Sequence, residues 1–176
     1  MLDDLALKYD TDKSSKGHWY TRYYTQIFGP IREQIGSVLE LGVSSGASVR
    51  MWKDFFPNAL VYGLDINEVV GDYGPRVAFL RCDQADEESL LGAFADAKLE
   101  IVIDDASHDQ EKTLDSLKYL FPLLQPGGWY VIEDMDTGTF PRKFANWMEL
   151  YRSAQSIQFF MDRGDGSWII FIQKKK

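Results

Sequence analysis

The sequence predicts an α/β protein with a doubly wound, mostly parallel sheet of seven strands. From residue 37 onward, short apolar segments alternate with segments in which apolar residues recur every three or four positions, which is typical of strands alternating with helices. Such alternation favours right-handed crossovers and parallel pairing. The last two apolar segments instead flank a turn-rich link, Asp162-Arg163-Gly164-Asp165-Gly166, so we expect a C-terminal antiparallel hairpin.

The predicted strands are short runs of Val, Ile, Leu and aromatic residues, at positions 38–41, 60–64, 77–81, 101–103, 129–132, 157–160 and 168–172. The predicted helices have one apolar face and cover positions 3–9, 20–28, 49–56, 89–94, 114–124 and 143–151. Gly29-Pro30 should end the second helix, and Pro126-Gly127-Gly128 should end the fifth. We expect a single domain over residues 1–176, with a helical cap and lid at 1–36 and a Rossmann-like core at 37–176.

The composition excludes several classes of partner. Lys and Arg total 19 against 27 for Asp and Glu, a formal charge of -8, so neither nucleic acid nor an anionic membrane surface is an expected partner. The single cysteine, Cys82, cannot form an internal disulfide, which fits a reducing compartment. The sequence has no apolar run of about 18 residues and no positively charged start. We therefore expect a cytoplasmic protein, and aromatic residues near the amino terminus leave a homo-oligomer open.

The first predicted strand leads into a glycine loop, Glu40-Leu41-Gly42-Val43-Ser44-Ser45-Gly46. In a doubly wound sheet, ligands bind at the carboxyl ends of the strands, and glycines let the backbone approach them closely. The Gly-x-x-x-Gly spacing differs from the Gly-x-Gly-x-x-Gly loop that cradles a pyrophosphate, and Glu40 would repel a pyrophosphate. A carboxylate here suits the cationic methionyl end of S-adenosylmethionine, which makes Glu40, Gly42 and Gly46 candidate cofactor residues.

Polar side chains also end the second and third predicted strands. Asp65 can accept hydrogen bonds from both ribose hydroxyls of a nucleoside, and Asp83 and Gln84 can bond an adenine amino group. Any one of the acids, taken alone, is explained as a turn residue. Glu40, Asp65 and Asp83 at three successive strand ends favour the cofactor site.

More acids follow the fourth and fifth predicted strands, at Asp104-Asp105 and Glu133-Asp134. Adjacent strands are about 5 Å apart, so these carboxylates should converge and need a cation between them, and oxygen ligands favour Mg²⁺ or a similar ion. His108 should start a helix capped by a Ser107-x-x-Gln110 box, where a neutral imidazole can act as general base. The alternative is that these acids only cap a turn. His18 follows a polar loop that has the character of a lid, although such a residue is more often structural.

The motifs resemble the metal-dependent O-methyltransferases that act on deoxysugars of macrolides and related glycosylated metabolites in antibiotic biosynthesis, a group of class I S-adenosylmethionine-dependent methyltransferases. The C-terminal antiparallel hairpin is typical of the same class. The resemblance covers most of the chain and includes Lys8-Tyr9-Asp10-Thr11-Asp12-Lys13, His18-x-Tyr20, Leu39-Glu40-Leu41-Gly42-Val43, Gly63-Leu64-Asp65-Ile66, Asp83-Gln84, Ile103-Asp104-Asp105-Ala106-Ser107-His108, and Pro126-Gly127-Gly128-Trp129-Tyr130-Val131-Ile132-Glu133-Asp134.

This resemblance implies roles for individual residues. Asp105, Glu133 and Asp134 would be the metal ligands, His108 the general base and Asp65 the ligand of the cofactor ribose. The methyl acceptor would be a hydroxyl of a small molecule, a sugar or another natural product. Ala106 stands where the family usually has glycine, and the segment after Asp134 is short, so we expect an acceptor pocket that is open or completed by another subunit.

Two other functions stay open at this point. Proteins described as cephalosporin hydroxylases resemble this fold and its acidic motifs, and hydroxylation needs oxygen and a reductant whereas methyl transfer needs neither. A non-catalytic module would bind S-adenosylmethionine without methylating an acceptor.

Overall fold

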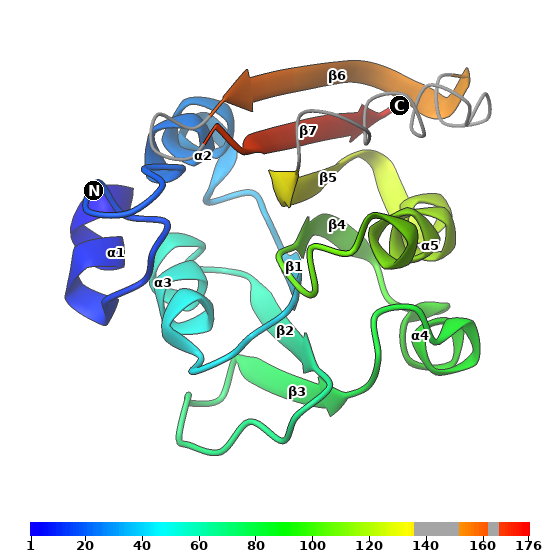
Figure 1. Cartoon of the computed structure of the whole chain (residues 1–176), viewed down its shortest axis with the longest axis horizontal. Coiled ribbons are helices and arrows are strands. Elements are labelled where there is room, and N and C mark those ends of the chain that lie inside the picture. The colour runs from blue at the N-terminus through cyan, green and yellow to red at the C-terminus, as the bar shows by residue number, and fades with distance from the viewer. Residues whose placement is uncertain (136–151, 162–165) are drawn as a thin grey trace.

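A seven-stranded sheet forms the centre of the computed structural model, which describes residues 1–135, 152–161 and 166–176. The strand order is β3-β2-β1-β4-β5-β7-β6 (Figure 1). Pairing is parallel from β3 through to β5, whereas β7 pairs antiparallel with both β5 and β6. This order confirms the predicted doubly wound sheet with an antiparallel hairpin at its C-terminal end.

The strands are β1 (Ser37–Leu41), β2 (Leu60–Asp65), β3 (Val77–Arg81), β4 (Leu99–Asp104), β5 (Leu124–Met135), β6 (Ala154–Met161) and β7 (Trp168–Lys174). The helices are α1 (Leu2–Tyr9), α2 (Thr21–Phe28), α3 (Ala47–Phe55), α4 (Glu87–Phe94) and α5 (Gln110–Leu120), with short 3-10 turns at Gly29–Ile31 and Phe121–Leu123. The helix predicted at 143–151 and most of the link between β6 and β7 lie outside the described residues.

Residues along each central strand alternate between two hydrophobic layers, because successive side chains of a strand point to opposite faces. In β1, Val38 packs in the layer formed with α1, α2 and α3, whereas Leu39 packs in the layer formed with α4 and α5. Ile101 and Val102 of β4 repeat the alternation. Figure 1 shows the two groups of helices on opposite sides of the sheet. With both faces covered, the ligand sites expected of this fold lie at the carboxyl edge.

The fifth helix ends earlier, and the fifth strand is longer, than the sequence predicted. α5 stops at Leu120, because Pro122 has no amide hydrogen with which to continue the helix. The prediction that Pro126-Gly127-Gly128 end that helix was wrong, since these residues lie inside β5, where the pairing with β4 is irregular. Glu133 and Asp134 also lie within β5, at a second irregularity in its pairing with β7, and do not follow the strand.

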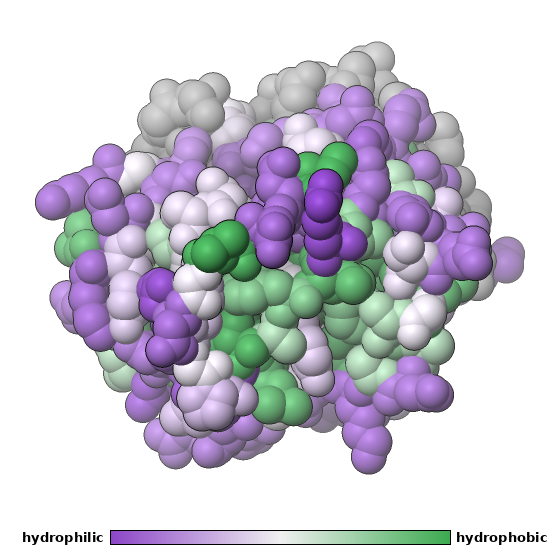
Figure 2. Space-filling model, turned by 90° about the horizontal axis from the view of Figure 1, so that it is seen from below, coloured by the Kyte–Doolittle hydropathy of each residue, from purple (hydrophilic) through white to green (hydrophobic). Residues whose placement is uncertain are grey.

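Apolar surface gathers at the centre of the face seen from below, with hydrophilic side chains around it (Figure 2). β3, the edge strand, lies at the bottom of Figure 1. Exposed large apolar residues in this part of the chain are Leu60 in β2 and Ile66 and Val70 between β2 and β3. Among the described residues, no helix has the length and apolar character that a bilayer span requires.

Candidate active site

The glycine loop after β1 packs directly against the end of β4. Gly42 has a φ of 83°, and a Cβ added to it would overlap the carbonyl oxygen of Asp105, so the residue must be glycine for this approach. The amide of Gly42 donates to Leu64 over 2.8 Å, and the amide of Asp105 donates to Leu41 over 2.9 Å. These bonds fix the ends of β1, β2 and β4 relative to one another.

Gly46 acts through its backbone. Its φ is 77°, it precedes the first residue of α3, and a Cβ here would overlap the ring of Tyr73. Gly46 is not among the residues that line the two cavities at this edge of the sheet. Its place in the structure therefore supports a role in shaping the loop and starting α3.

Asp65 ties the glycine loop to the end of β2. Its Oδ2 accepts hydrogen bonds from the amides of Val43, at 3.0 Å, and Ser44, at 2.9 Å, and its Oδ1 accepts one from Asn67 at 2.8 Å. Burial alone would raise the pKa of Asp65, but these backbone donors outweigh it and hold the pKa below its usual value. Asp65 is therefore a fixed, ionised acceptor.

A cavity of about 230 Å³ opens between the ends of β2 and β3, and we call it the β2–β3 cavity. Asp83 lies at its wall, where it accepts a 2.7 Å hydrogen bond from Lys112, and that bond lowers the pKa of Asp83. Gln84 is buried, donates to Asp104 over 3.1 Å and accepts from the amide of Ser107 over 3.0 Å. The lining residues are Gly42, Leu64, Asp65, Ile66, Asn67, Cys82, Asp83, Gln84, Ala106, Ser107 and Lys112.

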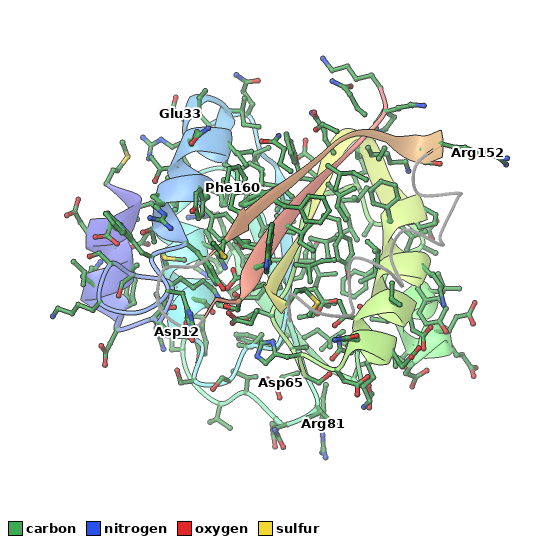
Figure 3. The ribbon with its side chains drawn as sticks, turned by 45° about the horizontal axis from the view of Figure 1, so that its top comes forward. Asp12, Glu33, Asp65, Arg81, Arg152 and Phe160 are labelled. Atoms are coloured by element: carbon green, nitrogen blue, oxygen red, sulfur yellow. The ribbon has the colours of Figure 1, made fainter. Side chains whose placement is uncertain are left out.

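A second cavity, of about 240 Å³, lies between the glycine loop and the N-terminal segment 10–13, and we call it the loop cavity. Gly42 lines both cavities, so they meet at this residue. Figure 3 shows Asp12 and Asp65 toward the same end of the molecule, with Glu33 and Arg152 at the other. The lining residues of the loop cavity are Asp10, Thr11, Asp12, Lys13, Gly42, Val43, Ser44, Ser45, Ala47, Ser48 and Asp105.

Lys13 lies among three carboxylates, which the sequence did not predict. Its side chain is 1% exposed, its Nζ forms an ion pair with Asp105, and the same Nζ is 2.7 Å from Glu133 Oε2 and 4.0 Å from Glu40 Oε1. The Lys13 ammonium thus lies between Asp105 and Glu133, where the sequence predicted carboxylates that share a metal ion. The signal available in the sequence was a lysine inside the polar loop at 10–17.

Burial and the charges of neighbouring residues set the pKa values of Lys13, Glu133 and Glu40. Burial favours the neutral form of Lys13, but Asp105, Glu133 and Glu40 reverse that preference and hold the pKa of Lys13 well above its usual value. Burial also raises the pKa of Glu133, against the effect of Lys13. The pKa of Glu40 is raised by burial to about 7.

Glu40 faces α3. Its carboxylate accepts hydrogen bonds from Ser48 at 2.7 Å and from the indole of Trp52 at 3.0 Å, and the residue is fully buried. Glu40 is not among the residues that line the two cavities. The structure thus gives this carboxylate a supporting position beneath the glycine loop.

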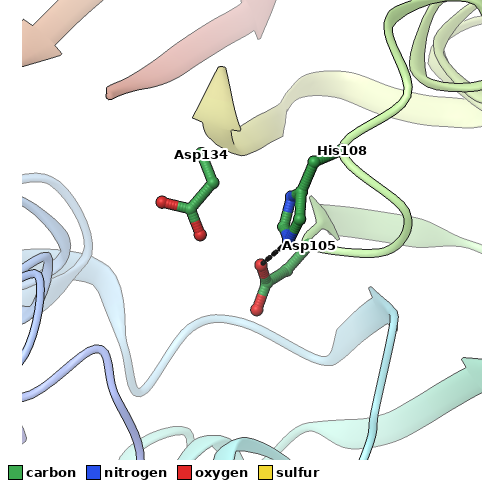
Figure 4. Close-up of side chains that lie close together, drawn as sticks. All are labelled: Asp105, His108 and Asp134. Carbon is green, nitrogen blue, oxygen red and sulfur yellow. Dashed lines mark ion pairs between the residues drawn. The ribbon is translucent and has the colours of Figure 1, made fainter. Parts of the chain in front are cut away.

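Asp105, His108 and Asp134 converge in front of the sheet edge (Figure 4). Each offers one ligand atom, and these atoms lie within 4.8 Å of one another. The Nε2 of His108 is 4.0 Å from Asp105 Oδ1. Glu133 faces Lys13 and Tyr24 and is not part of this trio.

The loop that carries His108 differs from the prediction. His108 has a φ of 55° and precedes α5, whose N-cap is Asp109, with its carboxylate accepting from the amides of Glu111 and Lys112. The predicted Ser107-x-x-Gln110 capping box is therefore wrong, and Ser107 Oγ accepts from Asp109 instead. This left-handed turn directs the imidazole toward Asp105 rather than along the helix.

Tyrosines of the N-terminal segment hold the acids at the end of β5. Tyr20 donates to Asp134 over 2.5 Å, and Tyr24 donates to Glu133. The Nδ1 of His18 is 3.8 Å from Asp134, and its ring stacks on Tyr20. The helical spacing of Tyr20 and Tyr24 predicted a core face, and both are fully buried, but their hydroxyl groups also reach the acids.

The Asp105, His108 and Asp134 set fits a small divalent cation. The two carboxylates offer the oxygen ligands that Mg²⁺ and Mn²⁺ prefer, whereas the imidazole is a ligand more typical of transition-metal ions. The same atoms also place His108 where it can act as a base instead of a ligand.

Known proteins are similar to this chain in both sequence and fold. Over 148 residues, the chain is 41% identical to the 8-demethyl-8-alpha-L-rhamnosyl tetracenomycin-C 2'-O-methyltransferase of Streptomyces olivaceus, covering 80% of this chain and 39% of that protein. It is 40% identical over 153 residues to the mycinamicin VI 2''-O-methyltransferase of Micromonospora griseorubida, covering 80% of this chain and 37% of that one. The chain thus spans well under half the length of these curated relatives.

A solved structure supports the fold assignment. The MycE methyltransferase from the mycinamycin biosynthetic pathway, in complex with Mg and S-adenosylhomocysteine (SAH), superimposes with a TM-score of 0.85 and 31% identity over 99% of this chain and 55% of that one. The class I methyltransferase fold expected from the resemblance is therefore confirmed. A family described as a methyltransferase domain matches residues 39–135, the region that holds the glycine loop, Asp65 and the acids of β4 and β5. Because that match spans more than half of the 176 residues, the chain belongs to this family of methyltransferase domains.

Proposed function

We propose that the chain binds S-adenosylmethionine across the two cavities and transfers its methyl group to a hydroxyl of a small molecule, a sugar or another natural product, with the help of a divalent cation such as Mg²⁺. The observation that carries the proposal is the place of Gly42. It lines both cavities, and its neighbour across the loop, Asp105, belongs to the trio with His108 and Asp134.

The β2–β3 cavity suits the nucleoside. Asp65 presents an ionised carboxylate, which matches two ribose hydroxyls, and Asp83 can accept from an adenine amino group. The side chain of Gln84 already bonds Asp104 and the Ser107 amide, and it would contact the adenine only through the hydrogen-bonding capacity that these two bonds leave. The loop cavity suits the amino-acid end of the cofactor. Asp10 and Asp12 on one side suit its ammonium group, and the start of α3 on the other suits its carboxylate.

The reaction needs a base, because the acceptor oxygen gains a methyl group and loses a proton. A bound divalent cation supplies the positive charge that lowers the pKa of a hydroxyl. Asp105 and Asp134 would hold it, and Glu133 is linked to Asp105 through the ammonium of Lys13, which pairs with both. His108 would take the proton, and Gly42 allows the close approach that puts the cofactor beside the acceptor. The names of the relatives, which describe O-methylation of glycosylated natural products, support this acceptor class.

Titration calorimetry tests the cofactor, with SAH as the probe and with or without Mg²⁺. We expect SAH to bind. We also expect methyl transfer from S-adenosylmethionine to mycinamicin VI, measured by mass spectrometry in the absence of oxygen, to require Mg²⁺. Absence of SAH binding would rule out the proposal. Binding without methylation of mycinamicin VI or of other glycosides would favour a non-catalytic module, and a product that forms only with oxygen and a reductant would favour a hydroxylase.

A further inference from the structure

We infer that Lys13 is a positioning residue that couples the loop cavity to the acids of β4 and β5, so that segment 10–13 closes on the amino-acid end of the cofactor only while Lys13 is bound between Asp105 and Glu133. The inference rests on the proposed function, because it assigns that end of S-adenosylmethionine to the loop cavity. It adds a role for a residue that neither the glycine loop nor the acid motifs include.

The side chain of Lys13 reaches from the loop cavity to the acids. Lys13 and Asp105 both line that cavity, and the Lys13 ammonium forms an ion pair with Asp105 and lies 2.7 Å from Glu133. Tyr24 donates to the other oxygen of Glu133, so this carboxylate is held on both sides. A lysine that is 1% exposed and faces two acids in this way has little freedom to move.

The backbone of segment 10–13 is tied to helices rather than to the sheet. The amide of Thr11 donates to Ala6 in α1 over 3.1 Å, and the carbonyl of Lys13 accepts from Thr21 in α2 over 3.1 Å. The carbonyl of Asp12 accepts from His18 over 2.8 Å. These bonds give the segment its shape, and the Lys13 ion pairs anchor that shape against the ends of β4 and β5.

Loss of the ammonium should therefore affect the two cavities differently. Without it, Asp105 and Glu133 repel each other, and the wall of the loop cavity loses its anchor. The β2–β3 cavity has no residue of segment 10–13 in its lining and keeps the hydrogen bonds that the amides of Val43 and Ser44 donate to Asp65. A ligand that fills only the β2–β3 cavity should bind as before.

The test compares SAH with adenosine as probes, by calorimetry in EDTA, in the wild type and in Lys13→Met. We expect SAH affinity to fall by roughly tenfold or more, because a buried charged partner has been removed, while adenosine affinity stays within about twofold. Lys13→Arg should restore part of the SAH affinity. Lys16→Met is the matched control, since Lys16 is exposed in the same loop, and it should bind both probes like the wild type.

A second variant separates anchoring from charge balance. Lys13→Met combined with Glu133→Gln removes the repulsion between Asp105 and residue 133 but does not restore the anchor of segment 10–13, so SAH binding should stay weak. The inference would be overturned if Lys13→Met lost SAH and adenosine binding equally, or if a folded Lys13→Met bound SAH like the wild type. It would also be overturned if the double variant recovered SAH binding or failed to fold. Absence of SAH binding in the wild type would instead refute the proposed function.

Discussion

The hydroxyl of Tyr20 donates a 2.5 Å hydrogen bond to Asp134 Oδ1, which joins the N-terminal segment to the end of β5. Tyr20 is fully buried, and its hydroxyl also lies 3.0 Å from Ser167 Oγ. The Oδ1 atom of Asp134 is thus fixed by the hydroxyl of Tyr20, while the same carboxylate lies close to Asp105 and His108. Groups that orient a ligand in this way tune the affinity of a metal site.

Removal of this hydroxyl should weaken metal binding without unfolding the protein. In Tyr20→Phe, we expect affinity for Mn²⁺, measured by electron paramagnetic resonance, to fall by about tenfold. Tyr9→Phe is the matched control, because Tyr9 donates an equally short 2.5 Å bond to Asp54, which is not a member of the trio. If both variants bind Mn²⁺ like the wild type, Tyr20 has no positioning role.

Gly42 and Gly92 should respond in opposite ways to the same added methyl group. Gly42→Ala forces a Cβ onto the Asp105 carbonyl at a φ of 83°, so we expect a loss of about 2 kcal/mol or more in unfolding free energy, together with loss of SAH binding. Gly92 lies inside α4 with nothing within 4 Å of its Cβ position, so Gly92→Ala should stabilise the protein by about 0.5–1 kcal/mol.

Urea unfolding and SAH calorimetry on the two variants check this pair. Gly92→Ala should bind SAH with wild-type affinity, because α4 contributes no residue to the lining of either cavity. A Gly42→Ala protein that binds SAH normally would show that the close approach of the glycine loop to β4 is dispensable.

The fold was predictable because burial patterns along the chain are strong. The alternation of Val38 and Leu39, and of Ile101 and Val102, reflects a sheet covered on both faces, and the turn-rich link before β7 indicated the hairpin. The end of α5 was missed because Leu124 continues a helical spacing of leucines. Pro122 nevertheless ends the helix before Leu124, which begins β5.

The candidate site was predictable only as a set of strand ends. Asp65, Asp105 and Asp134 were expected at one edge because parallel strands share an edge, and the structure brings Asp105 and Asp134 together with His108 and places Asp65 in the wall of the β2–β3 cavity. The insertion of Lys13 depends on tertiary packing of a loop about 90 residues earlier in the chain, for which no periodicity exists. The direction of the Glu40 carboxylate likewise depends on Trp52 and Ser48, which a strand pattern does not reveal.

His108→Ala should separate turnover from cofactor binding. The imidazole is 45% exposed and 4.0 Å from Asp105, close enough to the proposed metal to take a proton from an acceptor hydroxyl. We expect SAH affinity to stay unchanged and the rate of methyl transfer to fall by about 10²- to 10⁴-fold. The rate is measured under saturating S-adenosylmethionine with mycinamicin VI.

The affinity for Mn²⁺ in the same variant distinguishes two roles of His108. A general base can be removed with little change in metal affinity, whereas removal of a ligand weakens the metal site. Mn²⁺ affinity that falls together with turnover would assign His108 to the metal. Turnover equal to that of the wild type would exclude both roles.

Asp104 predicts a specific pH dependence of stability. Burial raises its pKa to about 6 from an ordinary value of 3.8, although Ser116 and Tyr130 donate hydrogen bonds to it. Between these two pH values the native state holds the proton more tightly than the unfolded state does. The free energy of unfolding should therefore fall as pH rises from about 4 to above 6, and the cost at higher pH is up to about 3 kcal/mol.

Asp104→Asn removes this cost while keeping the hydrogen bonds. The amide oxygen can accept from Gln84 as Oδ1 does now, and the amide nitrogen can donate to the hydroxyl oxygens of Ser116 and Tyr130. In EDTA, urea unfolding at pH 8 should find the variant more stable than the wild type by about 1–3 kcal/mol, and the difference should vanish near pH 4. A difference between the two proteins that stays constant from pH 4 to pH 8 would mean that Asp104 is not the titrating group.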